Sequence, residues 1–295
     1  LFGEILGFFV YDFWKRKIKT SFNLIELGPG KGTLLFDILR VTDNDKNFKN
    51  NLNLTLVEKN IKLAQAQKVL LKKCNLNFNK IKWLKNFNIN NKQPVIIYAN
   101  EFFDCFPIRQ FYKKNSKWIE KMIEFNTFKK GLSFKDKEVN DLKTLNIIDS
   151  YNPNDVLEIS KSREKYFSKI CKKINLVGGI MIAIDYGYLI KPDQFTLQAL
   201  FNNKKSHVLE NLGRQDISSH VDFEILIKIA KNQGLKINLF SSQHDFLLNY
   251  GIKERYQKLI TNCSKYQKEL LKKGLDRITD NNDMGSLFKF LIITN

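Results

Sequence analysis

Glycines at alternating positions follow a short apolar run early in the chain. Gly28, Gly30 and Gly32 stand in ELGPGKGT, residues 26–33. The run 22–25 before them has strand character, and the apolar residues after them recur at helical spacing. A strand, a glycine turn and a helix place backbone N–H groups and a helix N-terminus against a bound ligand. This arrangement predicts a site for a nucleotide-like ligand on a Rossmann-type sheet.

The spacing of these glycines excludes two common phosphate-binding motifs. A P-loop needs G-x-x-x-x-G-K-[ST], whereas Lys31 stands between two glycines. The dinucleotide fingerprint G-x-G-x-x-G fails because Thr33 occupies its last position. Glu26, just before the glycines, suits a ligand that carries an ammonium or a sulfonium rather than a pyrophosphate.

A second acidic residue ends the next predicted strand, LTLVE, where Glu58 is the last residue. In Rossmann-like folds a carboxylate at this place accepts hydrogen bonds from ribose hydroxyls. A generic tight turn with a surface glutamate would explain the glycines alone, but not the pattern around them. We therefore expect the cofactor to be S-adenosylmethionine rather than NAD. The residues predicted to bind it are Glu26, Gly28, Gly30, Gly32, Thr33, Glu58 and Asn100.

Two carboxylates follow a further predicted strand, in the sequence NEFFD at 100–104. Glu101 and Asp104 stand three residues apart and can face one way. Paired carboxylates suit a cationic acceptor such as an arginine guanidinium, which presents five donors and stays charged at neutral pH. Because methyl transfer from a sulfonium is an in-line displacement, positioning and electrostatics should dominate the catalysis. Glu101 and Asp104 are the predicted catalytic residues.

Other interpretations of the same residues remain open. Glu101 and Asp104 could cap a helix and pair with lysines or with Arg109, and their spacing alone does not decide. Asn100 with Phe103 could imitate the [DN]-P-P-[YF] turn of amino-group methyltransferases, although both prolines are missing.

Histidine and cysteine offer little further chemistry. The chain has three histidines and four cysteines, and no C-x-x-C spacing, so we expect no metal site. Ser-His-Val-Asp-Phe at 219–223 could hold a base, but a turn that caps a helix from 222 is the favoured interpretation.

Hydrophobic periodicity alternates between strand and helix patterns along the chain. The predicted strands are 22–27, 52–58, 81–84, 94–99, 178–184, 236–241 and 287–293. The predicted helices are 1–20, one from the glycine turn to about 41, 60–73, 155–174 and 222–233, with several more within 244–273. These elements predict an α/β fold with a doubly wound sheet.

Three details of this assignment concern the helical layer. Residues 1–20 are expected to form an amphipathic helix that covers the sheet, and the Asn- and Asp-rich segment 43–51 is expected to be a loop. The helix after the second strand is expected to present Leu63, Ala66 and Leu70 on one face.

Length and linker composition predict one domain over residues 1–295, since no internal repeat or low-complexity linker divides the chain. The expected core is 20–107 with 155–190. Residues 108–150 are an expected insertion, in which alternating apolar and polar residues predict a β-hairpin region. Residues 191–295 are an expected C-terminal α+β elaboration. The first residue is leucine rather than methionine, so we expect an N-terminal truncation.

The net charge of +19 is typical of nucleic-acid-binding proteins. However, only seven of the 49 basic residues are arginine, and phosphate and base recognition usually recruits arginine. We interpret the charge as a solvated lysine surface and expect no specific nucleic-acid partner. No apolar run approaches the length of a membrane span.

Seven motifs occur in the order seen in the MidA-like family. They are ELGPGKGT, NEFFDCFP (100–107), IDYG (184–187), TLQAL (196–200), DISSHVDF (216–223), HDFLLNYGI (244–252) and DMGSLFKFL (283–291). The opening LFGEILG also resembles the segment just before the core of that family. The resemblance therefore spans nearly the whole chain. The family contains the mitochondrial methyltransferase needed for assembly of respiratory complex I.

The resemblance implies a Rossmann-like class I S-adenosylmethionine-dependent methyltransferase. It implies symmetric N-methylation of a protein arginine on a core matrix-arm subunit of complex I. It places Gly28, Gly30 and Glu58 at the cofactor and makes Glu101 and Asp104 the best candidates to hold the arginine.

The same resemblance implies a protein substrate and a compartment, either the bacterial cytoplasm, which we prefer, or the mitochondrial matrix of a eukaryote. The alternatives are a non-catalytic assembly factor with this fold, or an RNA or small-molecule methyltransferase. The oligomeric state is not predicted.

Overall fold

The structure is a computed structural model of residues 1–295, and it describes all of them except residues 75, 128–130 and 153–155. The chain divides into two compact units. Unit 1 comprises Leu1–Phe102, Ser168–Gly187 and Ile227–Asn295, and unit 2 comprises Phe103–Phe167 and Tyr188–Leu226. The single-domain organisation and its boundaries stay a prediction.

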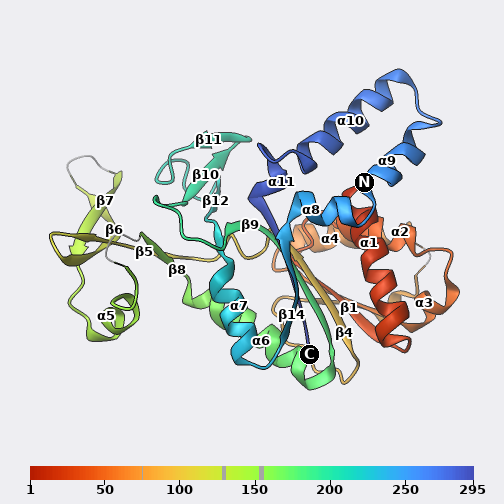
Figure 1. Ribbon diagram of the computed structural model, residues 1–295, viewed down its shortest axis with the longest axis horizontal. Coiled ribbons are helices and arrows are strands. Elements are labelled where there is room, and N and C mark those ends of the chain that lie inside the picture. The colour runs from red at the N-terminus through yellow and green to blue at the C-terminus, as the bar shows by residue number, and fades with distance from the viewer. Residues whose placement is uncertain (75, 128–130, 153–155) are drawn as a thin grey trace. The chain divides into compact units, whose positions relative to one another are not determined.

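Unit 1 is built on a mostly parallel sheet in the order β14-β15-β9-β4-β1-β2-β3 (Figure 1). Strands β3, β2, β1, β4 and β9 pair in parallel along this order, whereas β15 is antiparallel to both of its neighbours, β9 and β14. The strands are β1 (Phe22–Leu27), β2 (Leu52–Val57), β3 (Ile81–Leu84), β4 (Val95–Asn100), β9 (Gly179–Tyr188), β14 (Lys236–Ser242) and β15 (Phe288–Thr294). The predicted α/β fold is confirmed.

The order of the strands reverses between β1 and β4, because β2 and β3 lie on one side of β1 and β4 lies on the other. In open α/β sheets such a switch point is where ligands bind, beyond the carboxyl ends of the strands. The residues that follow β1, β2 and β4 are therefore those that the fold brings to a ligand.

Helices cover this sheet and bury its large side chains. The helices are α1 (Phe2–Phe13), a π-helical turn (Trp14–Ile18), α2 (Thr33–Val41), α3 (Lys46–Asn51), α4 (Ile61–Leu71), a 3₁₀ turn (Phe78–Lys80), α6 (Lys161–Val177), α7 (Phe223–Asn232), α8 (Gln243–Asn249), α9 (Ile252–Ile260), α10 (Lys265–Thr279) and α11 (Met284–Leu287). Residues of α1, α2 and α8 share one buried cluster with β1, β4 and β15, which confirms that the first helix covers the sheet (Figure 1). In that cluster the Trp14 ring lies 5.1 Å from the Phe48 ring and 5.9 Å from the Phe22 ring.

Unit 2 contains two small antiparallel sheets, of order β7-β6-β5-β8 and β11-β10-β12. Its elements are β5 (Arg109–Lys114), β6 (Lys117–Asn126), β7 (Gly131–Glu138), α5 (Leu142–Ile148), β8 (Leu157–Ile159), β10 (Gln198–Phe201), β11 (Lys204–Ser206), β12 (Asp216–Ser218) and β13 (Val221–Asp222). The antiparallel pairing of β5, β6 and β7 confirms the predicted hairpin region. Phe111, Trp118 and Leu157 are central to its small core.

Two predicted elements are wrong. The helix expected from 155 begins only at Lys161, because Leu157–Ile159 pairs as a strand with Arg109–Phe111 and buries Leu157. The expected loop at 43–51 contains α3, whose N-cap Asp45 accepts a hydrogen bond of 2.9 Å from the backbone amide of Phe48. The strand is stabilised by a partner far back in the chain, whereas the cap of α3 is a local contact.

None of the described helices combines the length and the apolar character needed to cross a membrane.

Candidate functional site

The glycine turn (residues 28–32) lies between β1 and α2, at the switch point of the sheet. Gly28 and Gly30 have φ values of 66° and 55°, in the left-handed region that glycine adopts without steric cost. A Cβ atom on Gly28 would lie 2.9 Å from Phe102, whereas a Cβ on Gly30 would meet nothing within 4 Å. The turn closes on itself, since the Gly32 amide donates to the Pro29 carbonyl at 2.8 Å. Helix α2 then begins at Thr33. Gly30 therefore leaves backbone open to a ligand.

Glu26, near the end of β1, is buried beside the Tyr98 side chain of β4. Its side chain is 3% exposed, and within the described part of the chain its Oε2 atom has no hydrogen bond. Burial raises the pKa of Glu26 to about 8, Tyr98 across the β1–β4 ladder lowers it, and the charge of Glu58 raises it further. The Tyr98 side chain is also fully buried, and its hydroxyl favours the charged form of Glu26. A buried acidic side chain with a raised pKa is stabilised in its charged form by a nearby cation, so Glu26 suits a cationic group of a ligand.

Glu58 follows β2 and is held by two hydrogen bonds. Its Oε1 atom accepts from the Asn60 amide at 2.8 Å, and its Oε2 atom accepts from Gln67 Nε2 at 3.2 Å. The backbone amide of Glu58 donates to the Leu84 carbonyl at 2.8 Å. The carboxylate is thus oriented at the carboxyl end of the sheet, as the sequence predicts.

Gln67, on α4, is a site residue that the sequence reasoning missed. The expected apolar face of this helix is wrong, because Ala66 is exposed and the buried residues are Gln67 and Leu71. Gln67 stands four residues after Leu63 and next to the expected face. A glutamine beside a helix face expected to be apolar was the one sign in the sequence that Gln67 could have a role.

The end of β4 carries Asn100 and Glu101. Glu101 is exposed and has a φ of 50°, which is uncommon for a residue other than glycine. Its backbone amide donates to the Ile184 carbonyl at 2.9 Å, and its Oε1 atom accepts from Asn100 Nδ2 at 3.2 Å. The next amide, of Phe102, donates to Asp185 Oδ2 at 3.2 Å. This backbone is therefore fixed from β9.

Asp104 belongs to unit 2, since the boundary between the units falls after Phe102. Asp104 is 8% exposed, and its carbonyl accepts a hydrogen bond of 3.1 Å from the Ser219 amide. The unit that holds Glu101 does not hold Asp104, so the pairing of these two carboxylates stays a prediction.

The helix-cap interpretation of this segment is wrong. Residues 101–108 are all described and none lies in a helix. Arg109 pairs instead with Glu120, with Nε 2.6 Å from Oε1 and Nη2 2.7 Å from Oε2.

Arg163 is the second residue that sequence reasoning missed. Its side chain is buried, and its Nε atom donates to the Phe103 carbonyl at 2.7 Å. Its Nη2 atom donates to Ser219 Oγ at 2.9 Å, and its Nη1 atom donates to the His220 carbonyl at 3.3 Å. Arg163 thus joins the 103–107 turn to the segment that contains the motif histidine.

The segment 219–223 leads into helix α7. Asp222 caps α7, with Oδ1 accepting from the Ile225 amide at 3.2 Å, so the predicted capping turn is confirmed with Asp222 as its cap. Burial lowers the pKa of His220, which the charge of Glu158 partly offsets.

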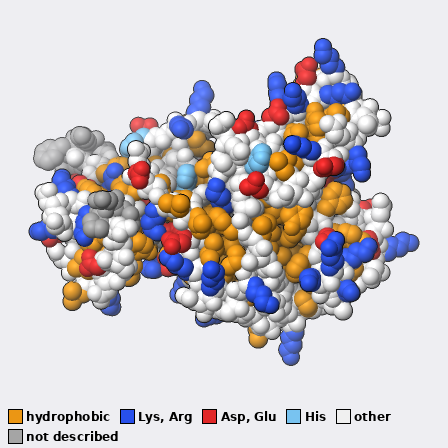
Figure 2. All heavy atoms as spheres, viewed as in Figure 1, with side chains coloured by type: hydrophobic (Ala, Val, Ile, Leu, Met, Phe, Trp, Pro, Cys, Tyr) orange, Lys and Arg blue, Asp and Glu red, His pale blue; other side chains and the backbone are white. Residues whose placement is uncertain are grey.

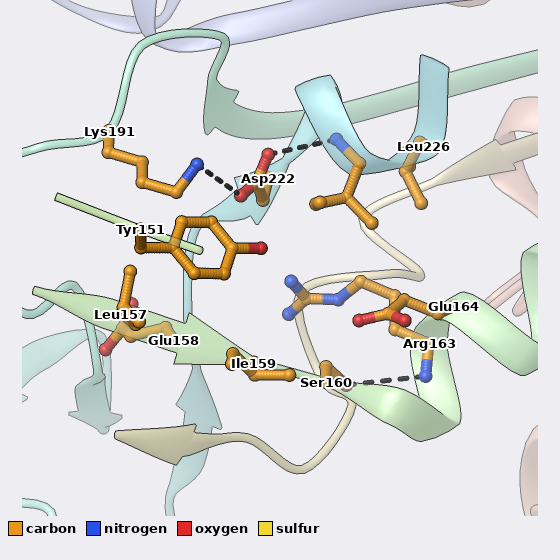
Figure 3. A pocket seen from close by; sticks show the side chains of 11 residues that line it. Tyr151, Leu157, Glu158, Ile159, Ser160, Arg163, Glu164, Lys191, Asp222 and Leu226 are labelled. Carbon is orange, nitrogen blue, oxygen red and sulfur yellow. Dashed lines mark hydrogen bonds and ion pairs between the residues drawn. The ribbon is translucent and has the colours of Figure 1, made fainter. Parts of the chain in front are cut away.

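A polar pocket lies within unit 2 (Figure 3). Its volume is about 20 Å³, which is room for about one water molecule. Figure 3 shows Lys191 reaching toward Asp222, with Nζ 3.6 Å from Oδ2, above the ring of Tyr151. None of the residues predicted to act on cofactor or substrate lines it. It is too small for a substrate.

Lysine and arginine side chains are spread over the face drawn in Figure 2, with aspartate and glutamate among them. Within the described residues, no group of three or more His, Cys, Asp or Glu side chains could hold a metal ion.

Comparison with known proteins gives consistent matches. Residues 5–241 match the model of a family described as S-adenosyl-L-methionine-dependent methyltransferase. The mitochondrial protein arginine methyltransferase NDUFAF7 of Xenopus tropicalis is 30% identical, over 99% of this chain and 73% of that protein. The human protein of the same name is 28% identical, over 99% of this chain and 71% of its own length.

A similar solved structure comes from Burkholderia thailandensis and holds S-adenosyl-homocysteine. It is 19% identical, has a TM-score of 0.84, and is matched over 100% of this chain and 76% of that chain. At 19% identity this similarity shows that the two chains share a fold, and it shows nothing more.

Proposed function

The chain belongs to the family of S-adenosyl-L-methionine-dependent methyltransferases, and we propose that it methylates arginine side chains of a protein. The observation that carries this proposal is the likeness to relatives named protein arginine methyltransferase, which runs over 99% of this chain. That likeness takes in both compact units and not the sheet alone.

The end of the sheet fits the cofactor of this family. S-adenosyl-L-methionine supplies a methyl group on a sulfonium, and it also carries an ammonium and a ribose. Glu26, whose Oε2 atom has no hydrogen bond within the described residues, would face the ammonium, and Glu58 would accept hydrogen bonds from the ribose hydroxyls. The open backbone at Gly30 would admit the ligand. The other residues that we assign to the cofactor are Gly28, Gly32, Thr33 and Asn100.

We assign the acceptor side to Glu101 and Asp104. Two carboxylates would orient the planar guanidinium through charge-assisted hydrogen bonds and would direct one nitrogen toward the methyl group. That nitrogen loses a proton as it gains the methyl group, and the exposed carboxylate of Glu101 can pass this proton to water. The backbone contacts of both residues support this role, because they fix where each side chain starts.

The finer assignments rest on the resemblance to the MidA-like family. We propose a core subunit of respiratory complex I as the protein substrate and symmetric dimethylarginine as the product. We also propose a single domain and the bacterial cytoplasm as the compartment. The eukaryotic relatives are named as mitochondrial.

The test uses S-adenosylmethionine with a labelled methyl group, the protein and a purified complex I core subunit. We expect label on arginine, reduced about 100-fold in Glu101→Gln and in Asp104→Asn. Glu124→Gln is the matched control, because Glu124 is a partly exposed carboxylate of β6 that pairs with Lys135. Binding of the subunit without transfer would favour the assembly factor, and label on RNA would favour the RNA methyltransferase.

A further inference from the structure

Gln67 connects three parts of the cofactor end of unit 1. Its Nε2 atom donates to the Gly30 carbonyl at 2.8 Å and to Glu58 Oε2 at 3.2 Å. Its Oε1 atom accepts from Trp83 Nε1, on β3, at 3.1 Å. The side chain is fully buried, at 0% exposure. One amide thus bridges the glycine turn, the carboxylate after β2 and the neighbouring strand.

The orientation of this amide is determined by its partners. The indole N–H of Trp83 can only donate, so it must face Oε1. The carbonyl of Gly30 can only accept, so it must face Nε2. The second hydrogen of Nε2 then falls to Glu58, and both N–H groups are used.

The same contacts determine what Glu58 has left to offer. A carboxylate has about four acceptor positions, two on each oxygen. In the described residues, Asn60 uses one position on Oε1 and Gln67 uses one on Oε2. One position therefore remains on each oxygen, which matches a vicinal diol such as that of a ribose.

We propose that Gln67 is a positioning residue that sets the Glu58 carboxylate for the ribose diol and ties it to the glycine turn. The glycine turn and the Glu58 carboxylate then move together. Binding of the ribose at Glu58 is therefore coupled to binding of the methionine end of the cofactor at the glycine turn. This inference rests on the proposed place of Glu58 at the cofactor.

Substitutions at position 67 separate the hydrogen bonds from the packing. Gln67→Met keeps the length of the side chain and removes all three hydrogen bonds. Gln67→Glu places a carboxylate against two acceptors, the Gly30 carbonyl and Glu58, and should be worse. Trp83→Phe keeps Gln67 and removes only the donor that fixes its orientation, so it is the mildest change. Gln65→Met is the matched control, because Gln65 is exposed on the same helix.

The experiment is isothermal titration of each variant with S-adenosyl-homocysteine, with thermal unfolding measured alongside. Relative to wild type we expect about tenfold weaker binding for Gln67→Met, more for Gln67→Glu, about threefold for Trp83→Phe and no change for Gln65→Met. Glu58→Ala should also bind more weakly. In the double variant with Gln67→Met, the two losses should not add, because Gln67 acts through Glu58.

The outcomes distinguish the inference from the proposed function. If wild type does not bind S-adenosyl-homocysteine, or if Glu58→Ala binds it as wild type does, the proposed cofactor site fails. If Glu58→Ala loses affinity while Gln67→Met and Trp83→Phe match Gln65→Met, only the role of Gln67 is overturned. Additive losses in the double variant would also overturn it, since they indicate a purely structural contribution.

Discussion

The glycine turn of unit 1 and the 103–107 turn of unit 2 are held in different ways. The glycine turn is fixed mainly by backbone hydrogen bonds, from Gly32 to Pro29 at 2.8 Å and from Gly28 to Val57 at 3.0 Å, and Gln67 adds one side-chain donor at the Gly30 carbonyl. The 103–107 turn is fixed by side chains from far along the chain. Arg163 donates to the Phe103 carbonyl, and Ser160 Oγ donates to the Pro107 carbonyl at 2.7 Å.

This difference has consequences for substitution. A turn fixed mainly by backbone hydrogen bonds fails when its backbone conformation is forbidden, and the damage should stay local. A turn fixed by a buried arginine fails when that one side chain is removed, because several acceptors lose their donor together. We therefore expect variants at the glycine turn to affect ligand binding first, and variants at Arg163 to affect unit 2 first.

The largest effect is expected for Gly30→Val. A β-branched residue strains the left-handed backbone at a φ of 55° and places its side chain where a ligand would lie. We expect no measurable binding of S-adenosyl-homocysteine by titration calorimetry. Because nothing lies within 4 Å of the new Cβ, circular dichroism should show the fold retained. Wild-type affinity in this variant would show that the ligand binds elsewhere.

Arg163→Met should destabilise the protein by about 3 kcal/mol, because buried carbonyls of Phe103 and His220 lose their charged donor. Arginine methylation should fall while affinity for S-adenosyl-homocysteine stays within about twofold. Urea unfolding, the methyl-transfer assay and calorimetry check these three expectations.

Arg214→Met is the control for this comparison, since Arg214 is an exposed arginine of the same unit. It should leave all three measurements unchanged. A parallel loss of cofactor affinity in Arg163→Met would contradict the separation of the two turns.

Glu26→Gln should change how stability depends on pH. The pKa of Glu26 is raised from 4.5 to about 8 in the folded state, so between these values the unfolded chain binds fewer protons than the folded chain. The contribution of Glu26 to the free energy of unfolding is therefore complete below about pH 4.5 and is lost as the pH rises toward about 8. Without cofactor, the variant should be more stable than wild type near pH 8, by on the order of 4 kcal/mol.

Thermal unfolding across this pH range measures the difference. In wild type, affinity for S-adenosyl-homocysteine should rise over the same range as Glu26 becomes charged, and in Glu26→Gln it should not. Identical pH profiles of the two proteins would contradict the raised pKa and the assignment of Glu26 to the ammonium.

The smallest effect is expected for Asn100→Ala. Its amide donates to Glu101 Oε1 at 3.2 Å, and this contact is exposed to solvent. Losing it should lower the rate of arginine methylation by about twofold to threefold. The steady-state rate with labelled methyl donor is the measurement. A loss as large as that of Glu101→Gln would contradict the minor contribution that we assign to Asn100.

Local sequence patterns predicted the sheet of unit 1 well, and they failed where distant residues decide. The strand at 22–27 was predicted with its observed bounds, because its burial and the following glycines are local signals. The strand Leu157–Ile159 was missed because its partner, Arg109–Phe111, lies far back in the chain. A three-residue strand has no periodicity of its own to detect.

The site residues also divide into those that local sequence shows and those that depend on distant contacts. Glu26 and Glu58 could be placed because the ends of parallel strands meet at one edge of a sheet. Gln67 and Arg163 could not, because their roles depend on hydrogen bonds to residues that only the folded chain brings near. A buried glutamine on a helix and a buried arginine are visible in a sequence only as residues that interrupt an expected pattern.

The central claim is that the methyl donor binds at the ends of β1 and β2, and a crystal structure with S-adenosyl-homocysteine tests it most directly. We predict the methionine end of the ligand against the glycine turn, with its ammonium facing Glu26. Both ribose hydroxyls should lie within hydrogen-bond distance of the Glu58 carboxylate. A ligand bound at another part of the chain, or a ribose that makes no contact with Glu58, would contradict the account.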